Sequence, residues 1–438
     1  PDRQPHPSLW EVRKVYQYIK TRPVDLDSGM VQVINRYDFL DLSEFYLEWT
    51  VVGDADTVAG GRITTLQLAP HDSSVVRLHI PVIHPAPGVE YFLTIQYRLK
   101  QARPFRPQGF VVAWDQFRLP LLREVPRIAI DTLAPLSIRD GVSEIVIEGE
   151  RFSIVFDKAT ATLGSLVYGG TELVLSGPVP NFWRPPTDND YGNGMPQRQG
   201  IWRDAGSRRV VERVTTNRVA PAVVRINVEA AIPAGGSRYY TSYTVYGSGD
   251  IVAENRFVPG DTTLPNLPRF GMTMTLPRAF DRIVWFGRGP HENYWDRNTG
   301  ATVGLYQGTV MEQYHPYIRP QENGNKSDVR WVALSDDRGT GLLAVGMPHL
   351  NVSAQHFLNE DFDGGPAKRQ RHTYHLTPRD LVMLNLDYRQ MGVGGDNSWG
   401  ARPHPEYTLP PREYFYSFRL RPFSADDPSP LTLSKLRF

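Results

Sequence analysis

The sequence predicts an all-β protein in which a short N-terminal helix and a small β-sandwich precede a large antiparallel sandwich of two packed sheets. Apolar and polar residues alternate with a period of two through most of the chain after Pro23, a pattern typical of strands with one buried face. Gly, Pro, Asp and Ser separate these short runs. The length of 438 residues exceeds one ordinary domain, so we expect at least two.

Residues 8–19 form the predicted helix. Ser8 is placed to cap it, and Glu11, three residues later, completes the pattern of a capping box. The apolar residues that follow the helical spacing and would share one face are Leu9, Val12, Tyr16 and Ile19. Residues 1–22 are therefore assigned to a helix-bearing connector.

Residues 23–125 contain short alternating runs that are typical of strands. The runs are residues 31–39, 45–53, 62–70, 75–82, 91–100 and 109–119. Six or seven strands in roughly 100 residues predict an immunoglobulin-like sandwich, here without the cysteine pair of antibody domains. A stretch marked by Pro and with weak periodicity follows, and we expect residues 126–141 to be a linker.

Residues 142–438 continue the strand pattern without a helical interval. This length of antiparallel strand predicts two large sheets packed face to face, a β-supersandwich. The pair Gly169 and Gly170, between two alternating runs, predicts a tight hairpin turn. No repeat of fixed period indicates a propeller or a solenoid.

Composition excludes several classes of function. The chain has 48 basic and 47 acidic residues and a net charge of +1, so no overall field attracts nucleic acid or an anionic membrane. No apolar run approaches the roughly 20 residues that span a bilayer. We therefore expect neither a nucleic-acid partner nor a membrane partner. The chain has no cysteine, which excludes disulfides and thiolate chemistry and is compatible with a soluble protein of the cytoplasm or the periplasm.

Four polar loops between the strands are candidates for chemistry. In the first, Asp188, Asn189 and Asp190 follow a proline pair and precede a glycine-rich run. They suit either a binding cleft or a turn whose side chains cap their own backbone. In the second, His291 and Glu292 could act as acid and base, or could belong to a buried network that holds the loop.

The third loop carries Glu322 beside amide side chains, which could bind sugar hydroxyls or bond within their own turn. The fourth is "MGVGGDNSWG", residues 391–400, whose glycines allow another surface to approach closely. Trp399 then either packs beneath its own loop or presents an aromatic face to a ligand. A short basic stretch, residues 366–375, is too isolated to indicate a nucleic-acid surface.

The chain contains five motifs in order: "DRQPHPSLWEVRKVYQ", "FWRPPTDNDYGNG", "GRGPHENYWDR", "YIRPQENGN" and "DYRQMGVGGDNSWG". Together they resemble the C-terminal half of family 2 (LacZ-type) β-galactosidases over the whole chain. The resemblance implies that residues 1–22 follow a catalytic barrel and that residues 23–125 form its immunoglobulin-like domain. It also implies that residues 142–438 form a galactose mutarotase-like β-supersandwich.

The resemblance implies that the catalytic glutamates of the parent enzyme, and its ligands for magnesium and sodium, lie upstream of this chain. Retaining glycosidases need two carboxylates about 5–5.5 Å apart, and the resemblance gives Asp188 and Asp190 no such role. We therefore expect no catalytic residue and no metal site in these 438 residues, and no activity of the chain alone. The parent enzyme would hydrolyse terminal β-D-galactosides such as lactose. This chain would have the barrel as its partner, and the parent enzyme would be a homo-oligomer.

The resemblance also implies that Trp399 stacks against the sugar from a neighbouring domain. Residues 188–190, with Asp396 and Asn397, would belong to the active-site loops, and residues 191–199 match a segment near that site. Two other functions fit the sequence. The chain could be an aldose epimerase or mutarotase that uses His291 with Glu292 or Glu322, or a carbohydrate-binding module that holds sugar through Trp399 alone.

Overall fold

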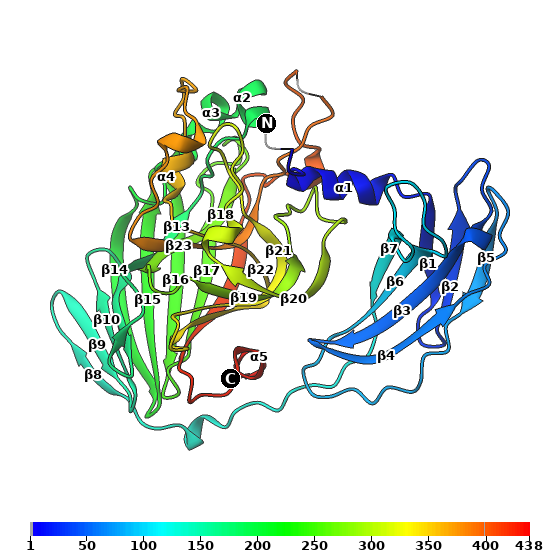
Figure 1. Ribbon diagram of the computed structural model, residues 1–438. Helices are drawn as coiled ribbons and strands as arrows, with labels where there is room; N and C mark the ends of the chain where they lie inside the picture. The colour runs from blue at the N-terminus through cyan, green and yellow to red at the C-terminus, as the bar shows by residue number, and fades with distance from the viewer. Residues whose placement is uncertain (1–2, 398) are drawn as a thin grey trace. The chain divides into compact units, whose positions relative to one another are not determined.

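The computed structural model describes residues 3–397 and 399–438 and is drawn in Figure 1. The chain divides into two compact units. The first comprises Pro1–Pro126 and Thr299–Leu305, and the second comprises Arg127–Asn298 and Tyr306–Phe438. Antiparallel strands dominate both units, as the alternating sequence predicted.

The first unit begins with helix α1 (Pro7–Val15). No side chain caps this helix, which starts after His6, so the predicted capping box at Ser8 is wrong. Pro7 has a backbone angle already suited to the first helical turn, and the helix therefore begins one residue earlier. The predicted apolar face is also wrong, because Leu9 is 52% exposed whereas the fully buried Ile19 opens the first strand.

The strands of the first unit form two antiparallel sheets. One sheet has the order β1-β2-β5 and the other has the order β4-β3-β6-β7. Their bounds are β1 Ile19–Asp25, β2 Met30–Asn35, β3 Phe45–Gly53, β4 Asp56–Ile63, β5 Ser73–Arg77, β6 Tyr91–Leu99 and β7 Val111–Arg118, with a 3-10 turn at Leu42–Glu44. Alternate residues of β3 are buried, which places their side chains in a core between the sheets.

The predicted strand over residues 62–70 is wrong beyond Ile63. There the chain leaves β4 and Leu66 enters the core from a loop. The carbonyl of Leu68 accepts hydrogen bonds from the Leu42 amide at 3.1 Å and the Asn35 side chain at 3.0 Å. These local partners satisfy the backbone in place of a neighbouring strand.

The second unit contains a small sheet and a large one, both antiparallel. The small sheet has the order β12-β11-β10-β9-β8. Its strands are β8 Ser137–Asp140, β9 Glu144–Glu148, β10 Phe152–Asp157, β11 Thr162–Tyr168 and β12 Thr171–Glu172. Strand β8 lies within the residues expected to be a linker, and a 3-10 turn at Ile130–Thr132 precedes it. Gly169 and Gly170 both have positive φ and turn β11 into β12, which confirms the predicted hairpin.

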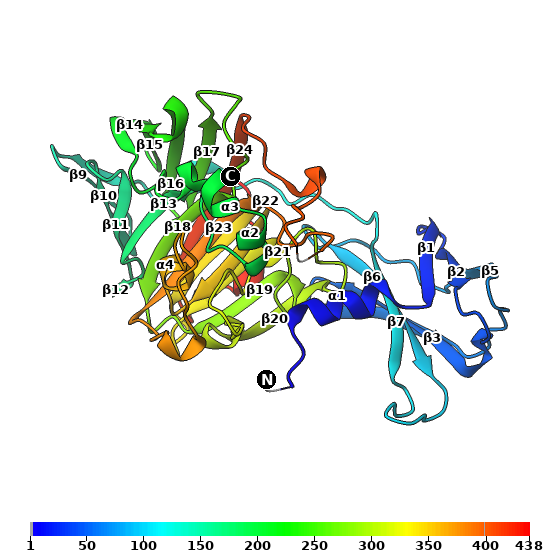
Figure 2. The ribbon, with the colours of Figure 1, turned by 90° about the horizontal axis from the view of Figure 1, so that it is seen from above.

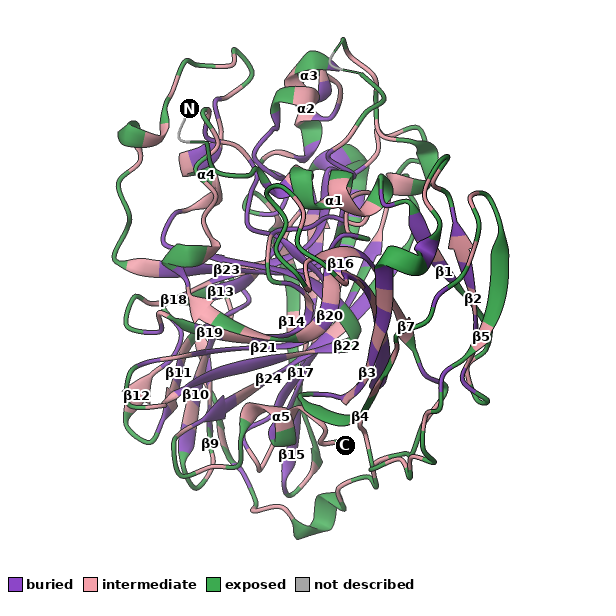
Figure 3. Ribbon diagram, turned by 45° about the vertical axis from the view of Figure 1, so that its right-hand side comes forward, coloured by how far each residue is buried: buried purple, intermediate pink, exposed green. Residues whose placement is uncertain are grey.

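The large sheet follows the order β13-β18-β23-β22-β24-β17-β16-β15-β14, with β21 joining β22 to β19 and β20. Its strands are β13 Ser176–Asn181, β14 Val210–Ala220, β15 Val223–Ile232, β16 Ser237–Tyr246, β17 Ile251–Val258, β18 Arg269–Pro277, β19 Arg282–Gly289, β20 Thr302–Thr309, β21 Lys326–Ser335, β22 Gly341–Gln355, β23 Leu381–Gln390 and β24 Tyr414–Phe423. Buried residues follow strands such as β21 and β23 (Figure 3), whereas β14 at the end of the order is mostly exposed.

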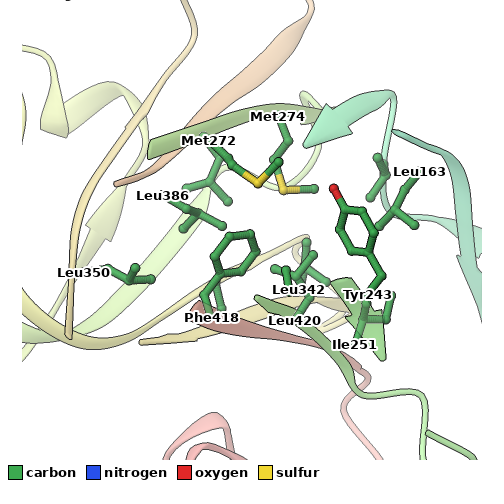
Figure 4. Packing of buried hydrophobic residues seen from close by; sticks show 14 of the residues in the cluster. Leu163, Tyr243, Ile251, Met272, Met274, Leu342, Leu350, Leu386, Phe418 and Leu420 are labelled. Atoms are coloured by element: carbon green, nitrogen blue, oxygen red, sulfur yellow. The ribbon is translucent and has the colours of Figure 1, made fainter. Parts of the chain in front are cut away.

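A hydrophobic core runs through the described residues of the second unit. Figure 4 shows Leu342, Phe418 and Leu420 from neighbouring strands packed with Met272 of β18. Leu163 of the small sheet belongs to the same core, so the two sheets share it. Fully burying each such side chain contributes roughly 1.5–3 kcal/mol to the free energy of unfolding.

Short helices lie at one end of the large sheet. They are α2 Asp188–Gly192, α3 Met195–Arg198 and α4 Asn359–Phe362, whereas α5 Pro430–Ser434 ends the chain. Further 3-10 turns lie at Gly200–Trp202, Ala234–Gly236, Met311–Gln313, Thr373–His375 and Pro405–Tyr407. Figure 2 shows α2 and α3 over the ends of the strands. Within the described residues, no helix is long and apolar enough to cross a membrane.

Candidate functional site

The first candidate loop forms helix α2. Thr187 caps this helix: its hydroxyl accepts a hydrogen bond from the Asp190 amide at 3.2 Å, and the Asp190 carboxylate accepts one from the Thr187 amide at 2.9 Å. Asp190 is thus a capping residue, as one of the two interpretations predicted. The side chain of Asp188, in contrast, is 55% exposed and lies 3.1 Å from the Lys368 ammonium.

A buried arginine joins α2 to the loop that carries Trp399. The guanidinium of Arg184 donates to both carboxylate oxygens of Asp190, at 2.9 and 3.0 Å, and the two side chains are 0% and 1% exposed. Arg184 also donates to the carbonyl of Met391 and, at 2.9 Å, to the carbonyl of Gly392. Asn189 donates to the carbonyl of Val393 at 3.1 Å. Residues 391–393 are therefore fixed by side chains of the first loop.

Asp296, from the second candidate loop, supports the same segment. Its carboxylate accepts a hydrogen bond from the Gly394 amide at 2.8 Å. A β-carbon at Gly392 would lie 2.6 Å from the same carboxylate oxygen, too close for any side chain. Glycine at this position thus serves the close approach of another surface, as the sequence predicted.

The tip of the loop, residues 395–399 as far as the structure describes them, faces solvent. Trp399 is 93% exposed, and its amide donates to the Asn397 side chain at 2.8 Å. The indole therefore does not pack beneath its own loop. Asp396 lies 2.9 Å from Nε2 of His404, and hydrogen bonding and charge from this carboxylate raise the pKa of His404.

Glu292 lies in a buried network. Its carboxylate accepts hydrogen bonds from Arg297 at 2.7 Å, from the Tyr317 hydroxyl at 2.5 Å and from the Gly324 amide at 2.7 Å. The neighbouring His291 contributes its carbonyl, which accepts from Asn293 at 3.0 Å. Glu292 thus joins the second loop to the third, as the structural interpretation predicted.

Glu322 belongs to a second buried group, around Arg269. The guanidinium of Arg269 lies 3.0 Å from Glu322 and 3.2 Å from Asp387. Burial raises the pKa of Glu322, although Arg269 opposes that shift. Burial also raises the pKa of Asp387 to about 7; the charge of Arg269 opposes this rise, and the charge of Glu322 adds to it.

Two family models match the chain. The model for the β-galactosidase small chain matches residues 148–420, and the model for β-galactosidase domain 4 matches residues 31–120. The chain belongs to the β-galactosidase family. It corresponds to the C-terminal region of LacZ-type β-galactosidases, which confirms what the five motifs predicted.

Curated relatives agree with the family models. The β-galactosidase of Priestia megaterium is 38% identical over 421 residues, covering 95% of this chain and 40% of that protein. The β-galactosidase of Halalkalibacterium halodurans is 31% identical over 417 residues, covering 93% of this chain and 39% of that protein. The chain thus spans about 40% of the length of these relatives. Among solved structures, galactose 1-epimerase from Lactobacillus acidophilus aligns with a TM-score of 0.36 and 12% identity, covering 67% of this chain and 99% of that one.

In this β-galactosidase region, hydrogen bonds and ion pairs connect most of the candidate loops. The candidate acidic residues fall into a buried group and an exposed group. Asp190, Glu292 and Glu322 are buried in ion pairs, whereas Asp188 and Asp396 are exposed. The residues that sequence reasoning missed are Arg184, Arg269, Asp387 and Gln390, whose side-chain amide donates to Glu322 at 3.2 Å. Arg184 in "FWRPP" and Asp387 in "NLDY" are charged residues inside apolar runs, and that signal could have identified both.

Proposed function

We propose that this region supplies one wall of a β-galactoside site whose catalytic carboxylates come from another part of the parent enzyme. The 93% exposure of Trp399 carries the proposal. Burying an indole would stabilise the fold, so a ring left in water on an anchored loop indicates a partner outside that loop. The apolar face of a galactose ring, with its C–H groups, matches such a surface.

The groups beside Trp399 suit the hydroxyls of a sugar. Asp396 and Asn397 are exposed within three residues of the ring and supply acceptor and donor atoms. Asp188 and Asn189 supply further polar groups from α2, which Asn189 ties to Val393. Residues 191–199 would complete the same side of the site.

Hydrolysis would need carboxylates from elsewhere in the parent enzyme. Asp190, Glu292 and Glu322 are each paired with a buried or nearly buried arginine, which leaves none of them open to a glycosidic bond. We propose that an upstream barrel supplies the acid and the nucleophile together with magnesium and sodium sites, and that the parent assembles as a homo-oligomer.

Hydrolysis of an aryl β-galactoside by the purified 438-residue chain tests this division of labour. We expect no turnover. Turnover that survives purification from a host without galactosidase, and that disappears in Glu292→Gln or Glu322→Gln, would contradict the proposal and favour catalysis within this region.

The wall itself is tested in the full-length parent enzyme. We expect Trp399→Ala to lower kcat/KM for a β-galactoside by about tenfold, because the stacking contact is lost. Phe415→Ala is the matched control, since Phe415 is an aromatic residue of β24 that is 61% exposed. Equal kcat/KM values in the two variants would rule out a binding role for Trp399.

A further inference from the structure

A hollow in the second unit lies between α4 and the segment that precedes β23. Its volume is about 320 Å³, and its polar lining comes from Asp361, Arg371, His375, Thr377 and Arg379. Small-molecule sites begin at roughly this size. The lining contains two guanidiniums against one carboxylate, so the pocket favours anions.

The single carboxylate of the pocket is already neutralised. Arg379 donates to Asp361 through two hydrogen bonds, at 2.6 and 2.7 Å, and Asp361 also accepts from the Leu358 amide at 2.8 Å. The Arg379 amide donates to the His356 carbonyl at 2.7 Å, which fixes the backbone of this arginine. The acid and Arg379 therefore form a rigid side of the pocket with little net charge.

Arg371 supplies the charge that remains. Its side chain is half-buried, and within residues 3–397 and 399–438 its guanidinium makes no direct hydrogen bond or ion pair, although its charge helps to lower the pKa of Asp361. Taking a guanidinium partly out of water without an acceptor is unfavourable, and an anion in the pocket would remove that cost.

His375 adds a neutral donor. Its Nδ1 accepts a hydrogen bond from the His372 amide at 3.0 Å, which requires that this nitrogen carry no proton. The imidazole then carries its hydrogen on Nε2. The ring of Tyr374, which is 78% exposed, lies 4.1 Å from the His375 ring between centroids and stacks on the His372 ring at 5.5 Å.

We propose that this pocket binds a phosphate group, either as inorganic phosphate or on a phosphorylated sugar. The planar donors of Arg371, the imidazole of His375 and the hydroxyl of Thr377 together suit an anion with three or more acceptor oxygens better than a carboxylate with two. The volume exceeds the need of a phosphate ion alone and leaves room for a sugar that carries the phosphate.

Calorimetric titration of the 438-residue chain tests the site, first with inorganic phosphate and then with galactose 6-phosphate. Sodium chloride holds the ionic strength constant, so that screening does not vary. We expect saturable binding of one equivalent and affinity lower by roughly tenfold in Arg371→Gln. Arg371→Lys keeps the charge without the planar fork, and we expect an intermediate affinity.

Arg208→Gln is the matched control, because Arg208 is an exposed arginine of the same unit outside the pocket lining. We expect its affinity to equal that of the unaltered chain. Tighter binding of galactose 6-phosphate than of phosphate would identify a sugar-borne group, and equal binding would identify the free ion. Absence of saturable heat with both ligands, or affinity unchanged in Arg371→Gln and Arg371→Lys, would overturn the proposal.

Discussion

The base of the Trp399 loop, residues 391–394, and its tip, residues 395–399, each have a pair of oppositely charged or hydrogen-bonded side chains. The pair at the base is buried, and the pair at the tip is exposed. At the base, Arg184 and Asp190 are 0% and 1% exposed, and Arg184 also donates hydrogen bonds to the carbonyls of residues 391 and 392. At the tip, the Asp396 and His404 side chains are 78% and 52% exposed. A buried charge without its partner is costly, whereas water replaces the partner of an exposed charge. The base therefore fixes the position of a tip that stays open to a ligand.

The largest expected effect is at the base. Arg184→Met leaves the carboxylate of Asp190 buried without its guanidinium, and we expect the second unit to lose about 3–5 kcal/mol of its free energy of unfolding. Urea denaturation measures the change. Arg213→Met, in the exposed pair with Glu229, is the control and should leave unfolding unchanged. Equal stability of the two variants would mean that burial does not distinguish the pairs.

A smaller effect is expected where the glycine of the loop meets Asp296. Gly392→Ala places a methyl group 2.6 Å from the carboxylate oxygen, and we expect a loss of about 1–3 kcal/mol from overpacking. Gly200→Ala is the control, because nothing lies within 4 Å of a β-carbon there. Thermal unfolding of both variants measures the difference. An unchanged free energy of unfolding in Gly392→Ala would show that the base of the loop shifts to make room for the methyl group.

The pH dependence of stability tests the buried group around Arg269. Burial raises the pKa of Asp387 from 3.8 to about 7. Between these values the folded state binds a proton that the unfolded state has released, so the free energy of unfolding falls as pH rises from about 4 to about 7. Urea denaturation at several pH values measures the change. As pH rises from 5 to 8, we expect the free energy of unfolding of Asp387→Asn to fall less than that of the unaltered chain. Parallel pH profiles would contradict the raised pKa.

The smallest effect on stability is expected at the tip. Asp396→Asn removes the charge that raises the pKa of His404, so that pKa should fall while unfolding stays unchanged. A histidine NMR titration measures the shift. Glu406→Gln is the control and should shift the pKa less, because Glu406 lies 3.8 Å from the ring and Asp396 lies 2.9 Å from it.

Elements with strong local patterns were predictable from the sequence. Strand β3 has the predicted bounds, because every second residue between Phe45 and Gly53 is buried. The turn at Gly169 and Gly170 was also predictable, since few residues other than glycine adopt positive φ at both positions of such a turn. The helix predicted over residues 8–19 exists as α1, but its end at Val15 was not predictable, because Ile19 has helical spacing and yet joins the core of a sheet.

The alternating sequence, its punctuation by Gly and Pro, and the five ordered motifs determined by themselves the all-β class, most strands and the β-galactosidase family. Only the tertiary structure decided which of the acidic residues are buried and which are open. Arg184 meets Met391 across 207 positions of sequence, and Arg269 meets Asp387 across two strands of the large sheet. Burial and pairing depend on such distant neighbours, because the cost of removing a charge from water is set by everything that surrounds it.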